Sequence, residues 1–92
     1  MESATLARMV PASVRVLTFA GARDVVGAPE FSLDLGAART AGELFDEVLA
    51  RFPGLVPYRG CLRIAVNGAY ASLEDPVRAG DEIALIPPVA GG

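Results

Sequence analysis

The stretch from Thr40 to Phe52 constrains the fold of this 92-residue chain most, because it carries the signals of a long amphipathic helix. Thr40 and Glu43 have the spacing of a capping box, and Pro53-Gly54 ends the helical pattern. A single apolar stripe runs along the segment and consists of Leu44, Phe45, Val48, Leu49 and Phe52. One stripe covers one face of a sheet, so the rest of the chain is expected to supply that sheet.

Five short segments around this helix are predicted strands, from their β-branched and aromatic content or from alternation of apolar and polar residues. They are residues 14–20, 31–35, 62–66, 70–72 and 82–86. Residues 21–27 are long enough for one or two helical turns, and Asn67-Gly68 is a strong hairpin signal. The order β, β, α, β, β, β with one main helix predicts an α+β domain with a mixed five-stranded sheet.

The first and last predicted strands carry apolar side chains on both faces. Leu17 and Phe19 in the first strand, and Ile86 in the last, lie opposite the other apolar residues of their strands. If these strands are neighbours, the three residues form an exposed apolar patch beside the start of the C-terminal segment, which would mark a protein interface. The alternative is that scattered apolar residues on a surface need no explanation.

The last six residues, Pro87-Pro88-Val89-Ala90-Gly91-Gly92, form a predicted extended tail. Each proline lacks the N–H that a sheet ladder needs, so the strand ends there. The side chains shrink towards Gly92, whose terminal carboxylate has a reference pKa of roughly 3.3–3.7 and could attack the α-phosphate of a nucleotide. An ordinary frayed end is the alternative. Residues 14–86 are then the folded domain, and residues 1–13 a loose extension with Met9 available as an internal start.

Charge and composition narrow the classes of function. The net charge is −3 and the eight basic residues, all arginines, are scattered, which disfavours nucleic acid as a partner. Apolar runs fall short of the roughly 20 residues of a membrane span. The chain has no histidine, so catalysis by this chain alone is unfavourable and no metal site is expected. The single cysteine favours a reducing, cytoplasmic setting.

Several polar residues are expected to have a structural role or to be solvated, without a part in the chemistry. Glu47 and Arg51 are spaced as i,i+4 partners on the solvent side of the helix. Cys61 is expected to be a small buried residue beside Leu62, without a role in sulfur chemistry. Three isolated carboxylates at turns or strand starts are expected to be solvated, and these are Asp24, Asp81 and Glu82.

Motifs along residues 14–92 resemble the small, sulfur-carrying subunit of molybdopterin synthase, a ubiquitin-like β-grasp family. The opening Val16-Leu17-Thr18-Phe19-Ala20, followed by Arg23-Asp24 and Gly27, is similar to that family's first strand and the turn after it. Val66-Asn67, Gly80-Asp81-Glu82-Ile83-Ala84 and the Pro-Pro-Val-x-Gly-Gly ending resemble its later motifs. The chain departs from the pattern at Thr18, where a larger apolar residue is usual, and residues 1–13 have no counterpart.

The resemblance implies a cycle centred on Gly92. A ubiquitin-activating-like enzyme would use ATP to adenylate its carboxylate, leaving a transient AMP adduct, and a sulfur donor would convert the adenylate to a thiocarboxylate. The tail would enter the large subunit and give sulfur to cyclic pyranopterin monophosphate, in a complex of two small and two large subunits. No cofactor would be bound stably by the small subunit itself. Residues implied to contact the large subunit are Phe19, Arg23, Ile86 and Leu17, with Pro87, Pro88, Val89, Ala90 and Gly91 along the tail.

Three other functions stay open at the level of sequence. A sulfur carrier of the thiamine pathway or another thiolation pathway would share the Gly-Gly ending, but would serve a different acceptor enzyme. A ubiquitin-like modifier would use the same ending and the same adenylation, but would finish in an isopeptide bond. A passive interaction domain would not need Gly92 at all.

Overall fold

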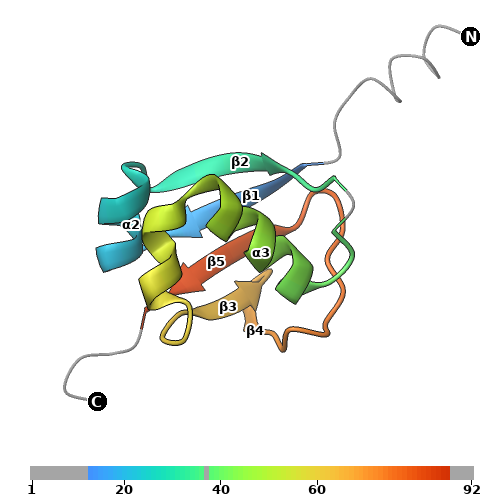
Figure 1. The fold of residues 1–92 in the computed structure, drawn as a ribbon. Helices are drawn as coiled ribbons and strands as arrows, with labels where there is room; N and C mark the ends of the chain where they lie inside the picture. The colour runs from blue at the N-terminus through green and yellow to red at the C-terminus, as the bar shows by residue number, and fades with distance from the viewer. Residues whose placement is uncertain (1–12, 37, 88–92) are drawn as a thin grey trace, which may run out of the picture.

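The computed structural model describes residues 13–36 and 38–87, which form one mixed sheet and its covering helices. The predicted α+β class and five-stranded mixed sheet are confirmed (Figure 1). In chain order the elements are β1 (Ser13–Thr18), α2 (Ala20–Val26), β2 (Glu30–Asp34), α3 (Ala41–Arg51), η1 (Pro53–Tyr58), β3 (Arg63–Val66), β4 (Ala69–Tyr70) and β5 (Glu82–Ile86).

β1 and β5, the first and last strands, lie side by side in the sheet, whose order is β2-β1-β5-β3-β4. They run parallel, with Leu17 opposite Ala84, and the other neighbouring strands are antiparallel. The adjacency that the apolar patch required is therefore confirmed. Because parallel strands finish at the same edge of a sheet, Thr18 and Ile86 bring the ends of β1 and β5 to one end of the molecule.

α3 packs across one face of the sheet and buries most of the predicted stripe (Figure 1). Leu44, Phe45, Val48 and Leu49 are buried, whereas Phe52 is only partly buried. Across from them, every second residue of the central strands faces the helix, which buries Val14, Val16, Ile83 and Leu85. The hydrophobic core therefore lies between α3 and this inner sheet face.

The predicted capping box at the start of α3 is present. The N–H of Glu43 donates to the Thr40 hydroxyl at 3.2 Å, and the N–H of Thr40 donates to the Glu43 carboxylate at 3.1 Å. Two further N–H groups of the first turn, those of Ala41 and Gly42, donate to carbonyls of the segment before β5 at 2.8 and 2.9 Å. These bonds satisfy helix donors that would otherwise have no partner.

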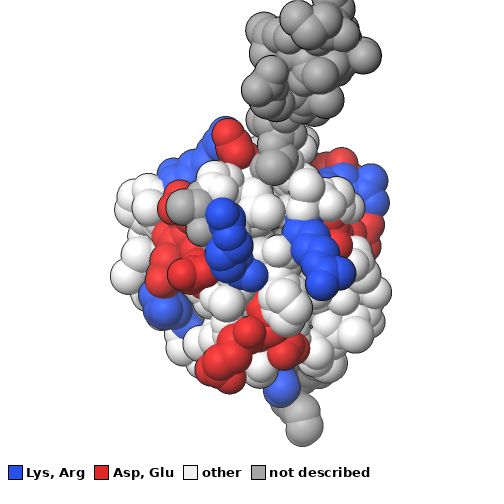
Figure 2. Space-filling model, turned by 90° about the vertical axis from the view of Figure 1, so that its right-hand side faces the viewer, with Lys and Arg blue, Asp and Glu red and all other residues white. Residues whose placement is uncertain are grey.

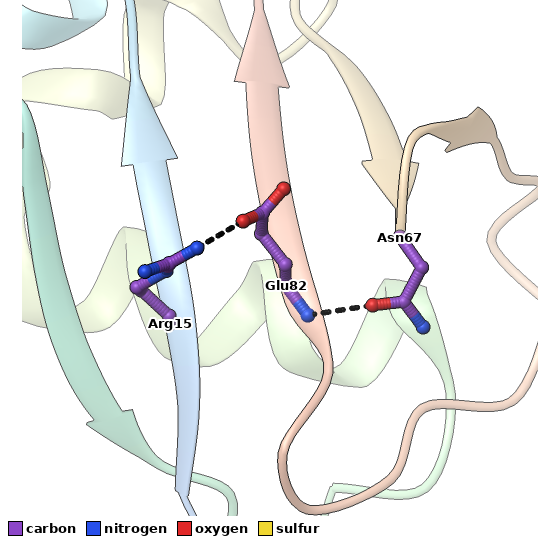
Figure 3. A network of polar contacts seen from close by, with 3 residues as sticks. All are labelled: Arg15, Asn67 and Glu82. Carbon is purple, nitrogen blue, oxygen red and sulfur yellow. Dashed lines mark hydrogen bonds and ion pairs between the residues drawn. The ribbon is translucent and has the colours of Figure 1, made fainter.

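The predicted hairpin turn at Asn67-Gly68 joins β3 to β4, with positive φ at both residues. The Asn67 side chain accepts from the N–H of Glu82 at 2.9 Å and donates to Asp81 at 3.0 Å. The Glu82 carboxylate in turn accepts from Arg15 of β1 (Figure 3). This hydrogen bond, with the nearby charge of Glu30, raises the pKa of Arg15. Asp81 and Glu82 therefore link β1, β3 and β5, and the prediction that they are isolated and solvated is wrong.

Two local predictions are wrong. Glu47 does not pair with Arg51, since the ion pairs within residues 13–36 and 38–87 are Arg15 with Glu82 and Arg59 with Asp46. The Arg51 guanidinium lies instead 5.9 Å from the ring centroids of both Phe31 and Phe52. Cys61 is exposed rather than buried, because it lies in the turn between η1 and β3.

Three strands are shorter than expected, and β3 is shorter by one residue because it begins at Arg63. β1 ends at Thr18 because Ala20, with φ of 48°, turns the chain into α2. β4 consists only of Ala69 and Tyr70. The 3₁₀-helix η1, which follows α3 directly, was not predicted. The left-handed conformation of Gly27 at the end of α2 was predicted and is confirmed.

Candidate functional site

The end of the molecule where β5 finishes is the candidate site, because it is the base of the predicted tail. β1 and β5 point to this end, and α2 and η1 lie beside it (Figure 1). Ile86, the last residue of β5, is half-buried and lies opposite Arg63 of β3, and Pro87 follows, also half-buried. The predicted tail residues Pro88, Val89, Ala90, Gly91 and Gly92 lie outside the described residues.

The sheet face away from α3, which we call the outer face, carries the predicted apolar residues. Leu17 of β1 and Ala84 of β5 are opposite each other on this face, and Ile86 lies two residues further along β5. All three are half-buried. The outer face is therefore partly apolar where it approaches the tail, as the alternation of β1 and β5 predicted.

Phe19 continues the outer face beyond β1 and is 47% exposed. It occupies the N-cap position of α2 in an extended conformation, and its carbonyl accepts from the N–H groups of Ala22 and Arg23 at 3.1 and 3.3 Å. Thr18, the residue before Phe19, is 2% exposed, and the Thr18 hydroxyl donates to the carbonyl of Ala28 at 2.5 Å. That bond satisfies a buried hydroxyl and explains why a polar residue is tolerated at this core position.

Arg23 lies on α2, one turn after Phe19, and is exposed. Its carbonyl accepts from the N–H of Gly27 at 2.7 Å, which closes the helix. The structure thus places the predicted contact residues of the described part near the end where the tail begins, and these are Leu17, Phe19, Arg23, Ile86 and Pro87.

Two residues of the outer face were missed by sequence reasoning, Arg63 and Tyr70. Tyr70 is 64% exposed and lies opposite Ala65, which in turn lies opposite Ala84. The Arg63 guanidinium lies 4.8 Å from the centroid of the Tyr70 ring. The Asn67-Gly68 hairpin signal contained this information, because a two-residue turn pairs Val66 with Ala69 and so places Tyr70 on the same face as Ala65.

A hollow of about 590 Å³ lies beside β3 and is lined by that strand, by Phe45 of α3, by the segment after β4 and by the turn that follows η1. Arg59 on its rim pairs with Asp46 at 2.7 Å and lies 5.6 Å from the Phe45 ring centroid. Cys61 lies on the same rim. Among residues 13–36 and 38–87, no three side chains of the metal-ligating types come together. The hollow thus offers an arginine-lined rim without the constellation of a metal centre.

The side of the molecule that faces the viewer in Figure 2 is mixed in charge. Arginines and carboxylates are interspersed among other residues on the side shown in Figure 2, so neither sign dominates that side. In the part of the chain that the structure describes, the helices are too short or too polar to cross a bilayer.

A mixed sheet with parallel β1 and β5 at its centre and one helix across a face defines a ubiquitin-like β-grasp protein. More particularly, the model of the ThiS family matches residues 16–92, and the chain belongs to this family.

Curated relatives from several organisms are named molybdopterin synthase sulfur carrier subunit, and two of them show the extent of the match. The one from Arabidopsis thaliana is 37% identical over 79 residues, which cover 86% of this chain and 82% of the relative. The one from Homo sapiens is 36% identical over 88 residues, which cover 91% of this chain and 100% of the relative.

Solved structures agree in fold. SAMP1 from Haloferax volcanii, a small archaeal modifier protein, superposes with a TM-score of 0.76 at 31% identity, covering 87% of this chain and 99% of that chain. The complex of subunits 1 and 2 of molybdopterin-converting factor from Helicobacter pylori contains a chain that superposes with a TM-score of 0.62 at 31% identity. The match covers 87% of this chain and 99% of that chain.

Proposed function

We propose that this chain is the sulfur carrier subunit of molybdopterin synthase, acting in molybdenum cofactor biosynthesis. The observation that carries the proposal is the family match through residue 92, which includes Gly91-Gly92, together with relatives of that name over most of the chain. The chain has no catalytic machinery of its own in this proposal. It presents a reactive carboxyl end, in a reducing cytoplasm, to enzymes that supply the chemistry.

The proposed chemistry takes place at the carboxylate of Gly92. One carboxylate oxygen attacks the α-phosphorus of ATP on a ubiquitin-activating-like enzyme, pyrophosphate leaves, and a glycyl adenylate forms. A sulfur nucleophile then attacks the acyl carbon, and AMP departs with the oxygen. Activation divides one difficult exchange of oxygen for sulfur into two easier steps, as covalent intermediates do in general. The sulfur of the resulting thiocarboxylate bonds to a carbon of cyclic pyranopterin monophosphate, and water then cleaves the bond between the sulfur and the Gly92 acyl carbon, which leaves the sulfur on the substrate and restores the carboxylate. ATP is consumed by the activating enzyme and no cofactor stays on the carrier.

The large synthase subunit is the proposed main partner, in an assembly of two small and two large subunits. The Helicobacter pylori complex of subunits 1 and 2 supports this type of partner. Leu17, Phe19 and Ile86 would dock on it, and Arg23 would contact it from α2. Pro87 and Pro88 restrict the backbone at the base of the tail, so less conformational freedom is lost when Val89, Ala90 and the glycines enter the partner.

Intact-protein mass spectrometry tests the proposal. The chain is incubated with its activating enzyme, ATP and a sulfur source, beside a variant that lacks Gly92. The expected result is a mass gain equal to the exchange of one oxygen for sulfur, restricted to the chain that retains Gly92. An unchanged mass, with an activating enzyme shown to be competent on another carrier, would refute the proposal.

A second candidate function is covalent protein modification, favoured by the 31% identity to SAMP1. All eight basic residues are arginines, so this chain offers no lysine for attachment of a second copy. A modifier of this kind would add single units to each target lysine instead of growing chains. Gels of cell extract separate the two functions, because conjugates would survive thiols as higher bands and a thiocarboxylate carrier would run as the free chain.

A further inference from the structure

Arg63 occupies a prominent position on the outer face, next to the base of the tail. It lies opposite Ile86, and Pro87 is the next residue of the chain. Its guanidinium is 4.8 Å from the centroid of the Tyr70 ring, a distance typical of a cation stacked on an aromatic face. The backbone pairing of Tyr70 with Ala65 places the ring on the same face as Arg63. Arg63 is therefore a cation that contacts an aromatic ring beside the base of the tail.

This cation has no carboxylate partner among the described residues. The ion pairs of residues 13–36 and 38–87 use Arg15 and Arg59, whose partners are Glu82 and Asp46. Around Arg63 the outer face is apolar or small, with Ile86, Ala65 and Ala84 as its neighbours in the register. A partner that covers this face would surround the guanidinium with protein, and an unpaired buried charge is costly.

We propose that Arg63, stacked on Tyr70, binds a carboxylate of the large synthase subunit and helps to select that subunit as partner. This inference rests on the proposed function, since it assigns a contact within that complex. The planar guanidinium offers N–H groups in a fixed fork that matches a carboxylate, which a lysine would not do.

Association with the cognate large subunit, measured by stopped flow at several salt concentrations, tests the inference. Arg63→Glu is expected to lower the association rate by about tenfold at low salt, and the charge-neutral Arg63→Met by about threefold, with a weaker salt dependence in both. The matched control is Arg78→Glu, which makes the same change of charge in an exposed turn. The N–H of Gly80 in that turn donates to the carbonyl of Ser13, which places the turn at the opposite end of β1.

The outcomes separate the inference from the function on which it rests. A large loss with Arg63→Glu, and little change with Arg78→Glu, supports the contact. Equal losses for both variants would show that only net charge matters and would overturn it, as would wild-type binding by Arg63→Glu and Arg63→Met. If the wild-type chain, with its tail intact, did not bind the large subunit at all, the proposed function itself would fail. Thermal melts check that each variant is folded.

Discussion

Phe19 occupies the N-cap position of α2 but makes no side-chain capping bond. Its substitution can therefore weaken binding to the partner without lowering the stability of the fold. Its side chain is 47% exposed and accepts nothing from the first turn of α2. In Phe19→Asp the new carboxylate can accept from the free N–H groups of that turn, so we expect unfolding stability to be unchanged or raised by about 0.5–1 kcal/mol. Binding to the large subunit is expected to weaken by tenfold or more, because an exposed aromatic anchor is replaced by a charge. Calorimetry and denaturant melts measure the two effects.

Leu73 supplies the matched control for this variant. It has the same exposure of 47% but lies in the segment after β4, against the start of α3. Leu73→Asp should leave binding to the large subunit unaltered. Phe19→Asp that binds like wild type, or that loses its cooperative melt, would contradict the prediction.

Cys61 is the residue that sulfur chemistry would most readily implicate, and its exposure makes that idea testable. We predict that Cys61→Ala still accepts sulfur at Gly92, because the proposed intermediates need only the terminal carboxyl group and an external sulfur nucleophile. Intact mass after the loading reaction gives the answer. A folded Cys61→Ala chain that gains no sulfur would assign the thiol a role in transfer.

At the scale of elements, α2 and η1 meet closely at Gly54. A β-carbon at this position would lie 2.8 Å from Cγ1 of Val25, a contact too short for real side chains. Gly54→Ala is therefore expected to push the two elements apart and to lower the free energy of unfolding by about 1–3 kcal/mol. Denaturant melts measure the loss. Gly60→Ala is the control, since nothing lies within 4 Å of its position, and Val25→Ala should recover part of the loss in the Gly54→Ala background.

Elements with local signals were predictable from the sequence. The capping box and the apolar stripe fixed α3 because both depend on residues three or four positions apart. The hairpin at Asn67-Gly68 and the left-handed Gly27 are similarly local. η1 was missed because a helix that contains Pro53 and Pro57 carries no apolar period. Arg51 was mispaired because Phe31, which its guanidinium approaches, comes from a strand twenty residues earlier.

The candidate site was predictable to the extent that it follows strand alternation and resemblance. Leu17, Phe19 and Ile86 could be placed on one face once β1 and β5 were assumed to be neighbours. The hairpin signal at Asn67-Gly68 was enough to pair Tyr70 with Ala65, but it did not place either strand beside β5. Arg63 and Tyr70 were missed because their position next to Ile86 depends on the pairing of β3 with β5, which are far apart in the sequence. Cys61 was misassigned because a turn residue does not continue the alternation of the strand that follows it.

For the molecule as a whole, the sequence predicts that the folded domain begins at residue 14, and truncation can test this boundary. β1 begins at Ser13, whose carbonyl accepts from the N–H of Gly80 at 2.8 Å, and the buried residues of the described core run from Val14 to Leu85. A chain that starts at Ser13 is therefore expected to keep the free energy of unfolding within about 0.5 kcal/mol of the full chain. It should also accept sulfur at Gly92.

A longer truncation shows why the boundary should lie at this residue. A chain that starts at Val16 loses the Ser13 carbonyl and the side chain of Val14, which is 2% exposed and opposite Leu33. Removal of that buried side chain alone should cost about 1.5–3 kcal/mol, so the melting temperature should fall sharply between the two truncations. Thermal melts of the full chain and of the two truncated chains, measured under the same conditions, test this prediction. A large loss already on removal of residues 1–12 would mean that this segment contributes to the fold, and the domain would have to be redefined to include it.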